Sequence, residues 1–256
     1  MGSSETFYPF DTYSADSILF RCSSLGHIMT ESKSKGDLSE TTKAHLCDKF
    51  VSAKYGRETD IQSKYLKKGL AVEEDAITLY SLETKTLFKK NEFTLSNRYI
   101  VGTPDLFTGS IIHEAQCVID VKSSWDIFTY FRAHRDKLNK MYYWQIMGYM
   151  ALTGAQIGKI VYCLVNTPDP LLFDEMNRLK WKMGVLNEDT DEVYQQAFKE
   201  LERLAKYEDI PRSERIHEIV VDRNDADIER IYERVKECRK WMNENLFKTL
   251  HSANVG

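Results

Sequence analysis

The chain contains 256 residues, of which 42% are hydrophobic, and it carries a formal net charge of −4. This length and apolar content suffice for one large core, and no linker rich in Pro, Gly or Ser divides the chain, so we expect a single domain over 1–256. The sequence shows no signal-peptide pattern and no apolar run of about 18 residues, which predicts a cytoplasmic protein without membrane contact.

The mildly acidic charge argues against a uniformly basic nucleic-acid binder, but the charges are distributed unevenly. The segments 33–68 and 122–140 lean basic, whereas the acidic excess follows Glu188. This asymmetry suits one face toward an anionic partner such as DNA and another toward solvent. The five cysteines are scattered without a paired spacing, which is typical of reduced thiols.

Apolar periodicity predicts that most of the chain is helical. The expected helices cover 39–55, 63–84 with Gly69 as a weak point, 125–138, 139–153, a segment opened by Asp169, 190–206 and 225–247. The last of these carries an apolar stripe, which we interpret as core packing, formed by Ile228, Ile231, Val235, Trp241 and Met242.

Strands are expected in the middle of the chain and again near its end. Short β runs separated by turn residues between Phe93 and Ser123 predict an antiparallel meander, and a buried strand at 159–166 and a late edge strand at 217–223 follow. Because each strand face needs cover, this order predicts an α/β fold, a mixed β-sheet flanked by helices with helical additions at both ends.

Asp120 and Lys122 lie two residues apart in an otherwise apolar run. In a strand they project from the same face, while Ile119 and Val121 pack behind them. A carboxylate and an ammonium on an apolar strand are costly to bury unless they are paired or bind a metal. The pair alone is equally typical of a solvated sheet face, so a functional site needs support from other residues.

Asp105 provides that support, because Gly102 and Pro104 fix a turn that presents it at the end of a strand. Asp120 follows fifteen residues later, a spacing that suits a hairpin with the two carboxylates side by side. Adjacent carboxylates repel each other unless a cation neutralises them. Hard oxygen ligands favour magnesium or manganese.

Two helical positions complete the pattern. Glu73 shares one face of its predicted helix with Ala76 and Tyr80, as expected for a helix that delivers one carboxylate inward. Gln145 and Tyr149 share a face of the helix 139–153, and Gly148 in the same helix allows a close approach to the sheet.

This order, a helical glutamate, then Gly-Thr-Pro-Asp, then Asp-Val-Lys, then a helical Gln-x-x-x-Tyr, resembles the PD-(D/E)XK nuclease superfamily. Within it, the chain is most similar to the phage lambda exonuclease and YqaJ-type viral recombinase group. The resemblance implies a restriction-endonuclease-like core over about 60–166, an N-terminal helical region over 1–59, and helical and edge-strand additions over 167–256. A fainter similarity lies at 21–26, where that group carries an arginine and a serine.

The resemblance implies roles for five of these residues. Asp105, Asp120 and the carbonyl of Val121 would hold Mg²⁺, for which Mn²⁺ can substitute, and Glu73 would assist this ion or hold a second one. Lys122 would orient or deprotonate the attacking water, and desolvation near the metal would lower its pKa enough to accept a proton. Asp120 stands where the nearest relatives often carry glutamate.

The resemblance also implies a 5′-to-3′ exonuclease that acts on ends of linear duplex DNA in phage-type recombination, as a homo-oligomer and with a single-strand annealing protein. Gln145 would support the site or contact DNA. The residues expected to contact DNA are Arg21, Ser23, Ser24, Arg132, Arg135 and Tyr149.

Three alternatives remain open at this point. A structure-selective endonuclease would use the same site, and a non-catalytic DNA-binding protein would use the same fold. An iron–sulfur nuclease is disfavoured, because that branch clusters cysteines near the chain end, where this chain has only Cys238.

Overall fold

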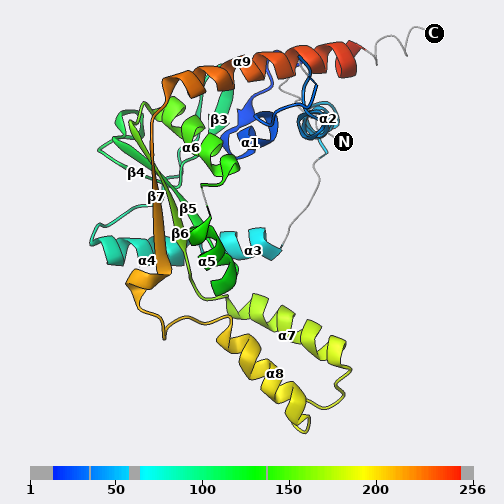
Figure 1. Cartoon of the computed structure of the whole chain (residues 1–256), viewed down its shortest axis with the longest axis vertical. Coiled ribbons are helices and arrows are strands. Elements are labelled where there is room, and N and C mark those ends of the chain that lie inside the picture. Colours follow the sequence, from blue (N-terminus) through cyan, green and yellow to red (C-terminus); the bar gives the residue numbers. More distant parts are fainter. Residues whose placement is uncertain (1–13, 35, 58–63, 137, 249–256) are drawn as a thin grey trace, which may run out of the picture.

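The computed structural model describes residues 14–34, 36–57, 64–136 and 138–248, and a four-stranded mixed sheet lies at its centre (Figure 1). The strands, in their order across the sheet, are β4 (Leu106–Thr108), β5 (Cys117–Ser123), β6 (Ile157–Cys163) and β7 (Ile216–Asp222). The central pair β5–β6 is parallel, and both outer pairs are antiparallel. The predicted mixed sheet and the predicted edge position of the last strand are confirmed.

A smaller mixed sheet contains β1 (Phe20–Arg21), β3 (Ile100–Gly102) and β2 (Leu95–Ser96), in that order. The predicted single meander is therefore wrong, because its strands divide between two sheets. Pro104 follows β3 and has no N–H to continue a ladder. The partner that β3 gains instead is β1, which comes from the N-terminal part of the chain and pairs in parallel.

Two helices cover the two faces of the four-stranded sheet. Alternation along β5 and β6 sends Val118 and Ile160 toward α6 (Lys140–Thr153), and sends Ile119 and Val161 toward α4 (Glu73–Thr84). Asp120 and Lys122 therefore lie on the α6 face of the sheet.

Two glycines in this region allow close approach. A Cβ on Gly158 of β6 would lie 2.5 Å from Ile146 Cγ1, so this glycine lets α6 approach the sheet. A Cβ on Gly148 would instead collide with Leu25 and Cys22, at 2.7 and 2.8 Å. The sequence correctly predicts close packing at Gly148, but the neighbours are the N-terminal helical turns and not the sheet.

An outer helical layer lies over α6 and contains α1 (Leu25–Ile28), α2 (Glu40–Tyr55) and α9 (Asp225–Met242), with α9 running along one end of the molecule (Figure 1). A π-helical turn (Asn243–Phe247) continues α9. The Ser39 side chain caps α2 by accepting from the Thr42 N–H. The predicted apolar stripe of the last helix is confirmed as core packing, with Ile228, Ile231, Val235 and Met242 buried.

The predicted helix over 63–84 is divided into α3 (Lys64–Ala71) and α4. The break falls at buried Val72, whose φ and ψ of −116° and 12° leave the helical region, and not at Gly69. The change of direction lets Lys68 enter the protein interior, where Nζ donates to the Trp125 carbonyl at 2.8 Å.

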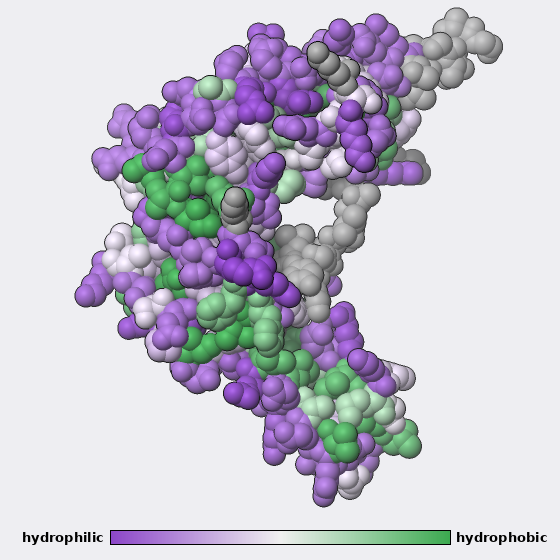
Figure 2. Space-filling model, in the orientation of Figure 1, coloured by the Kyte–Doolittle hydropathy of each residue, from purple (hydrophilic) through white to green (hydrophobic). Residues whose placement is uncertain are grey.

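The remaining helices are α5 (Ile127–Arg135) and a hairpin of α7 (Asp169–Met183) and α8 (Glu192–Arg203) that projects from the body (Figure 1). Short 3-10 turns lie at Cys22–Ser24, Ile112–Glu114 and Arg212–Arg215. Apolar surface gathers on the hairpin, where Phe173, Trp181 and Leu186 are exposed (Figure 2). No helix in the described part of the chain has both the length and the apolar character needed to cross a membrane.

Candidate active site

The β4–β5 hairpin brings Asp105 beside β5, as its sequence spacing predicts. Leu106 pairs with Ile119, so the preceding residue, Asp105, lies next to the backbone of Asp120 and Val121. Asp105 Oδ2 accepts a hydrogen bond from the Val121 N–H at 2.7 Å. This bond fixes the carboxylate at the edge of the sheet.

Asn91, which the sequence analysis did not identify, holds the turn that carries Asp105. Its backbone N–H donates to the Asp105 carbonyl at 2.8 Å, and its side-chain Nδ2 donates to the Pro104 carbonyl at 2.8 Å. Nδ2 also donates to the Phe93 carbonyl at 3.1 Å. Asn91 is buried in an irregular segment, where neither periodicity nor a motif marks it.

Asp120 is 2% exposed and has two different environments for its two carboxylate oxygens. Oδ1 accepts from Gln145 Nε2 at 2.9 Å. Oδ2 lies 2.8 Å from Lys122 Nζ as an ion pair but accepts no well-aligned hydrogen bond. A buried carboxylate oxygen with unused acceptor capacity is what a cation-binding site requires.

Gln145 is buried and links the charged residues of β5. Its Oε1 accepts from Lys122 Nζ at 3.3 Å, while its Nε2 donates both to Asp120 and, at 3.0 Å, to the Tyr149 hydroxyl. The predicted shared helix face of Gln145 and Tyr149 is confirmed. Tyr149 is itself buried, so its contact is with Gln145 and not with DNA as the sequence suggested.

Lys122 Nζ also lies 4.8 Å from the ring centroid of Tyr142. Burial lowers the pKa of Lys122, but the charges of Asp120 and Asp105 outweigh burial and hold this pKa above its ordinary value. The expectation that desolvation lowers the pKa of Lys122 is therefore corrected. Without a metal ion Lys122 is therefore a charged ammonium, and such a group can orient water or phosphate.

Glu73 begins α4 and lies in the same cleft as the two aspartates. Its Oε2 is 2.9 Å from Nζ of Lys90, a residue that the sequence analysis did not identify. Both side chains are partly exposed, so this ion pair is weak enough to exchange for another cation. The structure thus places Glu73 in the cleft but pairs it with a lysine.

The two aspartates of the cleft both have raised pKa values, and burial is the largest cause for each. Burial, and then the negative charge of Asp120, raises the pKa of Asp105 to about 7. Burial raises the pKa of Asp120 as well, with a further contribution from Glu73. A divalent cation would relieve this repulsion, so the residues fit the magnesium site that the sequence predicts.

The donor set also limits how a metal would be held. Within the described ranges, no three His, Cys, Asp or Glu side chains are close enough to hold a metal by themselves. Asp105, Asp120 and the Val121 carbonyl would therefore share the ion with water and substrate, which is the usual coordination of magnesium. All five cysteines are free thiols, as predicted.

These residues line an open cleft of about 980 Å³ between α3, β5, α5 and α6. Arg21 also lines it, and Ser24 Oγ donates to the Arg21 carbonyl at 2.9 Å. Ser23 is exposed outside the cleft lining. Arg132 and Arg135 lie on the side of α5 that borders a second groove, so the structure separates them from the carboxylates.

No protein-family model matches the sequence, and no curated protein is significantly similar to it. Solved structures do match. The phage-related exonuclease from Haemophilus somnus 129PT is 25% identical, with a TM-score of 0.68 over 91% of this chain and 96% of that one. The alkaline exonuclease LHK-Exo from Laribacter hongkongensis is 14% identical, with a TM-score of 0.62 over 96% and 98% of the two chains.

A structure of LHK-Exo in complex with dAMP matches similarly, at 15% identity and a TM-score of 0.60 over 95% and 98% of the two chains. These likenesses extend over nearly the whole of each chain, including the helical additions. Together with the hairpin-borne aspartates and the Asp-x-Lys strand, they show that the chain shares the fold of a phage-related exonuclease and an alkaline exonuclease, which supports the resemblance to the phage lambda exonuclease and YqaJ-type group.

Proposed function

We propose that this protein is a magnesium-dependent deoxyribonuclease that hydrolyses phosphodiester bonds. The observation that carries this proposal is the convergence of Asp105, Asp120 and Lys122 in one open cleft, with Asp120 buried and its Oδ2 without a hydrogen bond. The similarity to a phage-related exonuclease supports the same conclusion.

The charged residues of β5 and its neighbours have separate parts in the proposed reaction. Asp105, Asp120 and the Val121 carbonyl would hold the ion, which when bound supplies an acidified water and stabilises charge on the phosphate. The Lys122 ammonium orients the water or neutralises a phosphate oxygen. Gln145 keeps Asp120 and Lys122 in place through its two hydrogen bonds.

We further propose that the enzyme acts on the ends of linear duplex DNA as a 5′-to-3′ exonuclease. Arg21 supports this, because it lies in the lining of the cleft and has no ion-pair partner in the part of the chain described. An arginine at this position can bind a terminal phosphate through charge-assisted hydrogen bonds. The resemblance supports a role in phage-type recombination, a homo-oligomer and an annealing partner.

The decisive experiment incubates the protein with end-labelled linear duplex and with covalently closed circular duplex, in Mg²⁺ or in EDTA. We expect Mg²⁺-dependent release of nucleotides from linear DNA only. Asp105→Asn and Asp120→Asn should abolish release, whereas Asp174→Asn, an exposed carboxylate on α7, should not. Cutting of closed circles would establish the endonuclease alternative, and binding of DNA without hydrolysis in Mg²⁺ would establish a non-catalytic protein.

The terminal-phosphate role of Arg21 is tested with linear duplexes that carry a 5′-phosphate or a 5′-hydroxyl. The phosphorylated duplex should be degraded faster, and Arg21→Ala should remove the difference. Arg178→Ala on α7 serves as the matched control, because Arg178 is exposed and far from the cleft lining. Equal rates on both duplexes with the wild type would refute a phosphate pocket at Arg21.

A further inference from the structure

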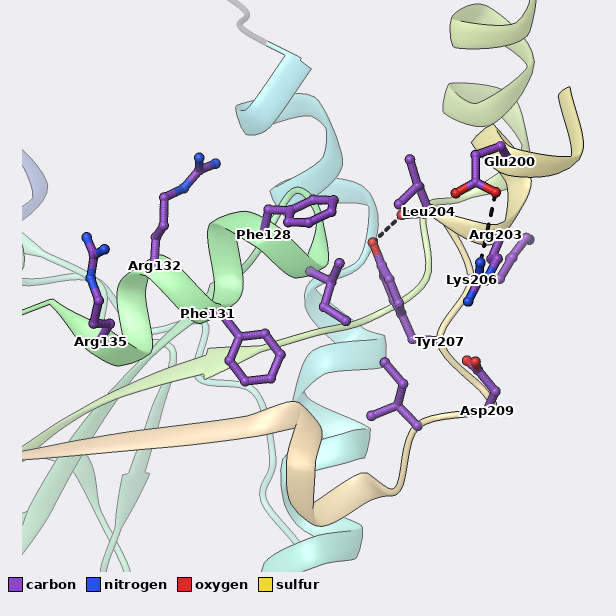
Figure 3. Close-up of a pocket in the computed structure, with 12 residues that line it drawn as sticks. Phe128, Phe131, Arg132, Arg135, Glu200, Arg203, Leu204, Lys206, Tyr207 and Asp209 are labelled. Atoms are coloured by element: carbon purple, nitrogen blue, oxygen red, sulfur yellow. Dashed lines mark hydrogen bonds and ion pairs between the residues drawn. The ribbon is translucent and has the colours of Figure 1, made fainter. Parts of the chain in front are cut away.

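A second hollow, of about 650 Å³, lies between α5 and the segment that ends α8 (Figure 3). We call it the α5–α8 groove and define it by Phe128, Phe131 and Arg132 on one side and Arg203, Leu204 and Tyr207 on the other. It contains none of the carboxylates of the active-site cleft. Its chemistry therefore needs a separate explanation.

The groove displays aromatic rings that the core does not use. Phe128 is 61% exposed and Phe131 is 53% exposed, and they lie three residues apart on one helix. Tyr207, which is buried, forms the floor between them and α8, and its hydroxyl donates to the Leu204 carbonyl at 2.5 Å. Each exposed ring can stack against another flat apolar group.

The groove is positive although the protein as a whole is negative. Its lining includes four cations, Arg132, Arg135, Arg203 and Lys206, against the two carboxylates of Glu200 and Asp209. Arg135 pairs with Asp136 at 2.7 Å, Arg203 with Glu200 at 4.0 Å and Lys206 with Asp169 at 2.6 Å. Both arginine pairs are exposed, so anions in solution can compete for the two guanidinium groups. Arg132 is exposed and forms no ion pair within the described ranges.

A single helix separates this groove from the active-site cleft. The cleft is lined by Thr129 and Ala133 of α5 and by Asp136, the C-terminal cap of this helix. Phe128 and Phe131 line the groove from the other side of the same helix. A helix with its side chains is about 10–12 Å across. A chain that leaves the cleft therefore reaches the groove by crossing α5.

We propose that the α5–α8 groove binds a single-stranded segment of nucleic acid, with unpaired bases stacked on Phe128 and Phe131 and phosphates at Arg132 and its neighbouring cations. Duplex DNA hides the faces of its bases, so exposed rings favour an unpaired strand. The source of the strand rests on the proposed function, because hydrolysis of one strand of a duplex leaves the other unpaired beside the cleft.

The test is binding of a fluorescein-labelled oligothymidylate, measured by fluorescence anisotropy in EDTA so that no hydrolysis occurs. Phe128→Ala and Phe131→Ala should each weaken binding on the order of 10-fold, the usual effect of removing a stacking ring. Arg132→Gln should weaken binding and reduce its dependence on salt. Phe173→Ala, a ring of 60% exposure on α7 outside the groove, should retain the wild-type affinity.

A hairpin-capped duplex without unpaired ends provides the comparison ligand, and its affinity should change less than that of oligothymidylate in the two phenylalanine variants. Circular dichroism checks that each variant is folded. We expect both variants to fold, because the two rings are exposed and contribute little to the core. If both variants bind oligothymidylate like the wild type, the inference is overturned. If these variants also lose the self-association that the wild type shows in sedimentation, the groove is instead a contact between copies of the protein.

Failure of this inference is distinguishable from failure of the proposed function. If the wild type hydrolyses DNA but the groove variants keep full oligothymidylate binding, only the proposal that the groove binds single strands is refuted. A wild-type protein that never hydrolyses DNA, but whose oligothymidylate binding falls in Phe128→Ala and Phe131→Ala, refutes only the nuclease proposal.

Discussion

Replacing Asp105 with asparagine should stabilise the metal-free protein at alkaline pH while it abolishes hydrolysis. The reason is the raised pKa of Asp105, about 7 against an ordinary 3.8, which burial and the charge of Asp120 cause. Above pH 7 this carboxyl group is ionised in the folded protein, and the buried charge beside Asp120 costs free energy of folding. Asparagine is neutral, and its side-chain oxygen can still accept the hydrogen bond from the Val121 N–H.

The magnitude follows from linkage between pKa and stability. At 1.36 kcal/mol per pH unit, the raised pKa corresponds to a cost of about 4 kcal/mol above pH 7. Because the repulsion is shared with Asp120 and relaxes through water in the open cleft, we expect about 1–3 kcal/mol. The folded pKa lies above the unfolded one, so the wild type loses stability as pH rises from about 3.8 to 7, and the advantage of asparagine grows over this window and is constant above it.

Urea unfolding in EDTA at pH 5 and pH 8 measures this difference directly. The free energy of unfolding of Asp105→Asn, relative to that of the wild type, should increase from pH 5 to pH 8. Asp174→Asn, an exposed control on α7, should show no such increase. Added Mg²⁺ should stabilise the wild type more than the variant. If Asp105→Asn is less stable than the wild type at pH 8 in EDTA, the cost of burying the Asp105 charge beside Asp120 does not dominate the stability of the site.

Three further predictions follow from the same contacts. Lys122→Ala should slow single-turnover hydrolysis on the order of 10²–10³, the range for loss of one charge-stabilising donor, while metal affinity in calorimetry stays within a few-fold; loss of metal binding would make Lys122 structural. Asn91→Ala leaves the Pro104 carbonyl without its donor and should destabilise the protein by about 1–3 kcal/mol in urea, and an unchanged midpoint would refute its role. Burial lowers the pKa of Lys68 to about 8, so wild-type stability should rise between pH 8 and 10.5, and Lys68→Met should remove that rise in thermal unfolding.

The regular elements were largely predictable because local patterns dictate them. Ser39 caps α2 as its sequence position indicates, and the stripe of α9 is buried as its periodicity indicates. The division of the meander into two sheets was not predictable, because β3 pairs with β1 from a distant part of the chain. The break at Val72 was also missed, since it depends on the space that the core offers to Val72 and Lys68.

The acidic pair could be predicted because a hairpin spacing and a period of two are local rules. These rules placed Asp105 beside β5 and placed Asp120 with Lys122 on one face. Local rules say nothing about which side chains come from elsewhere to complete the cleft. Lys90 beside Glu73 and Asn91 beneath Asp105 were therefore missed.

The sequence by itself determined the order of helices and strands, the alternation that places Asp120 and Lys122 on one face of β5, and the turn that carries Asp105. Only the tertiary structure decided the charge states and neighbours of these groups. The pKa of Lys122 depends on the balance between burial and the aspartates around it, and the burial of Tyr149 depends on how α6 packs. Burial and distance between charges are properties of the packed chain, because residues far apart in the sequence create them.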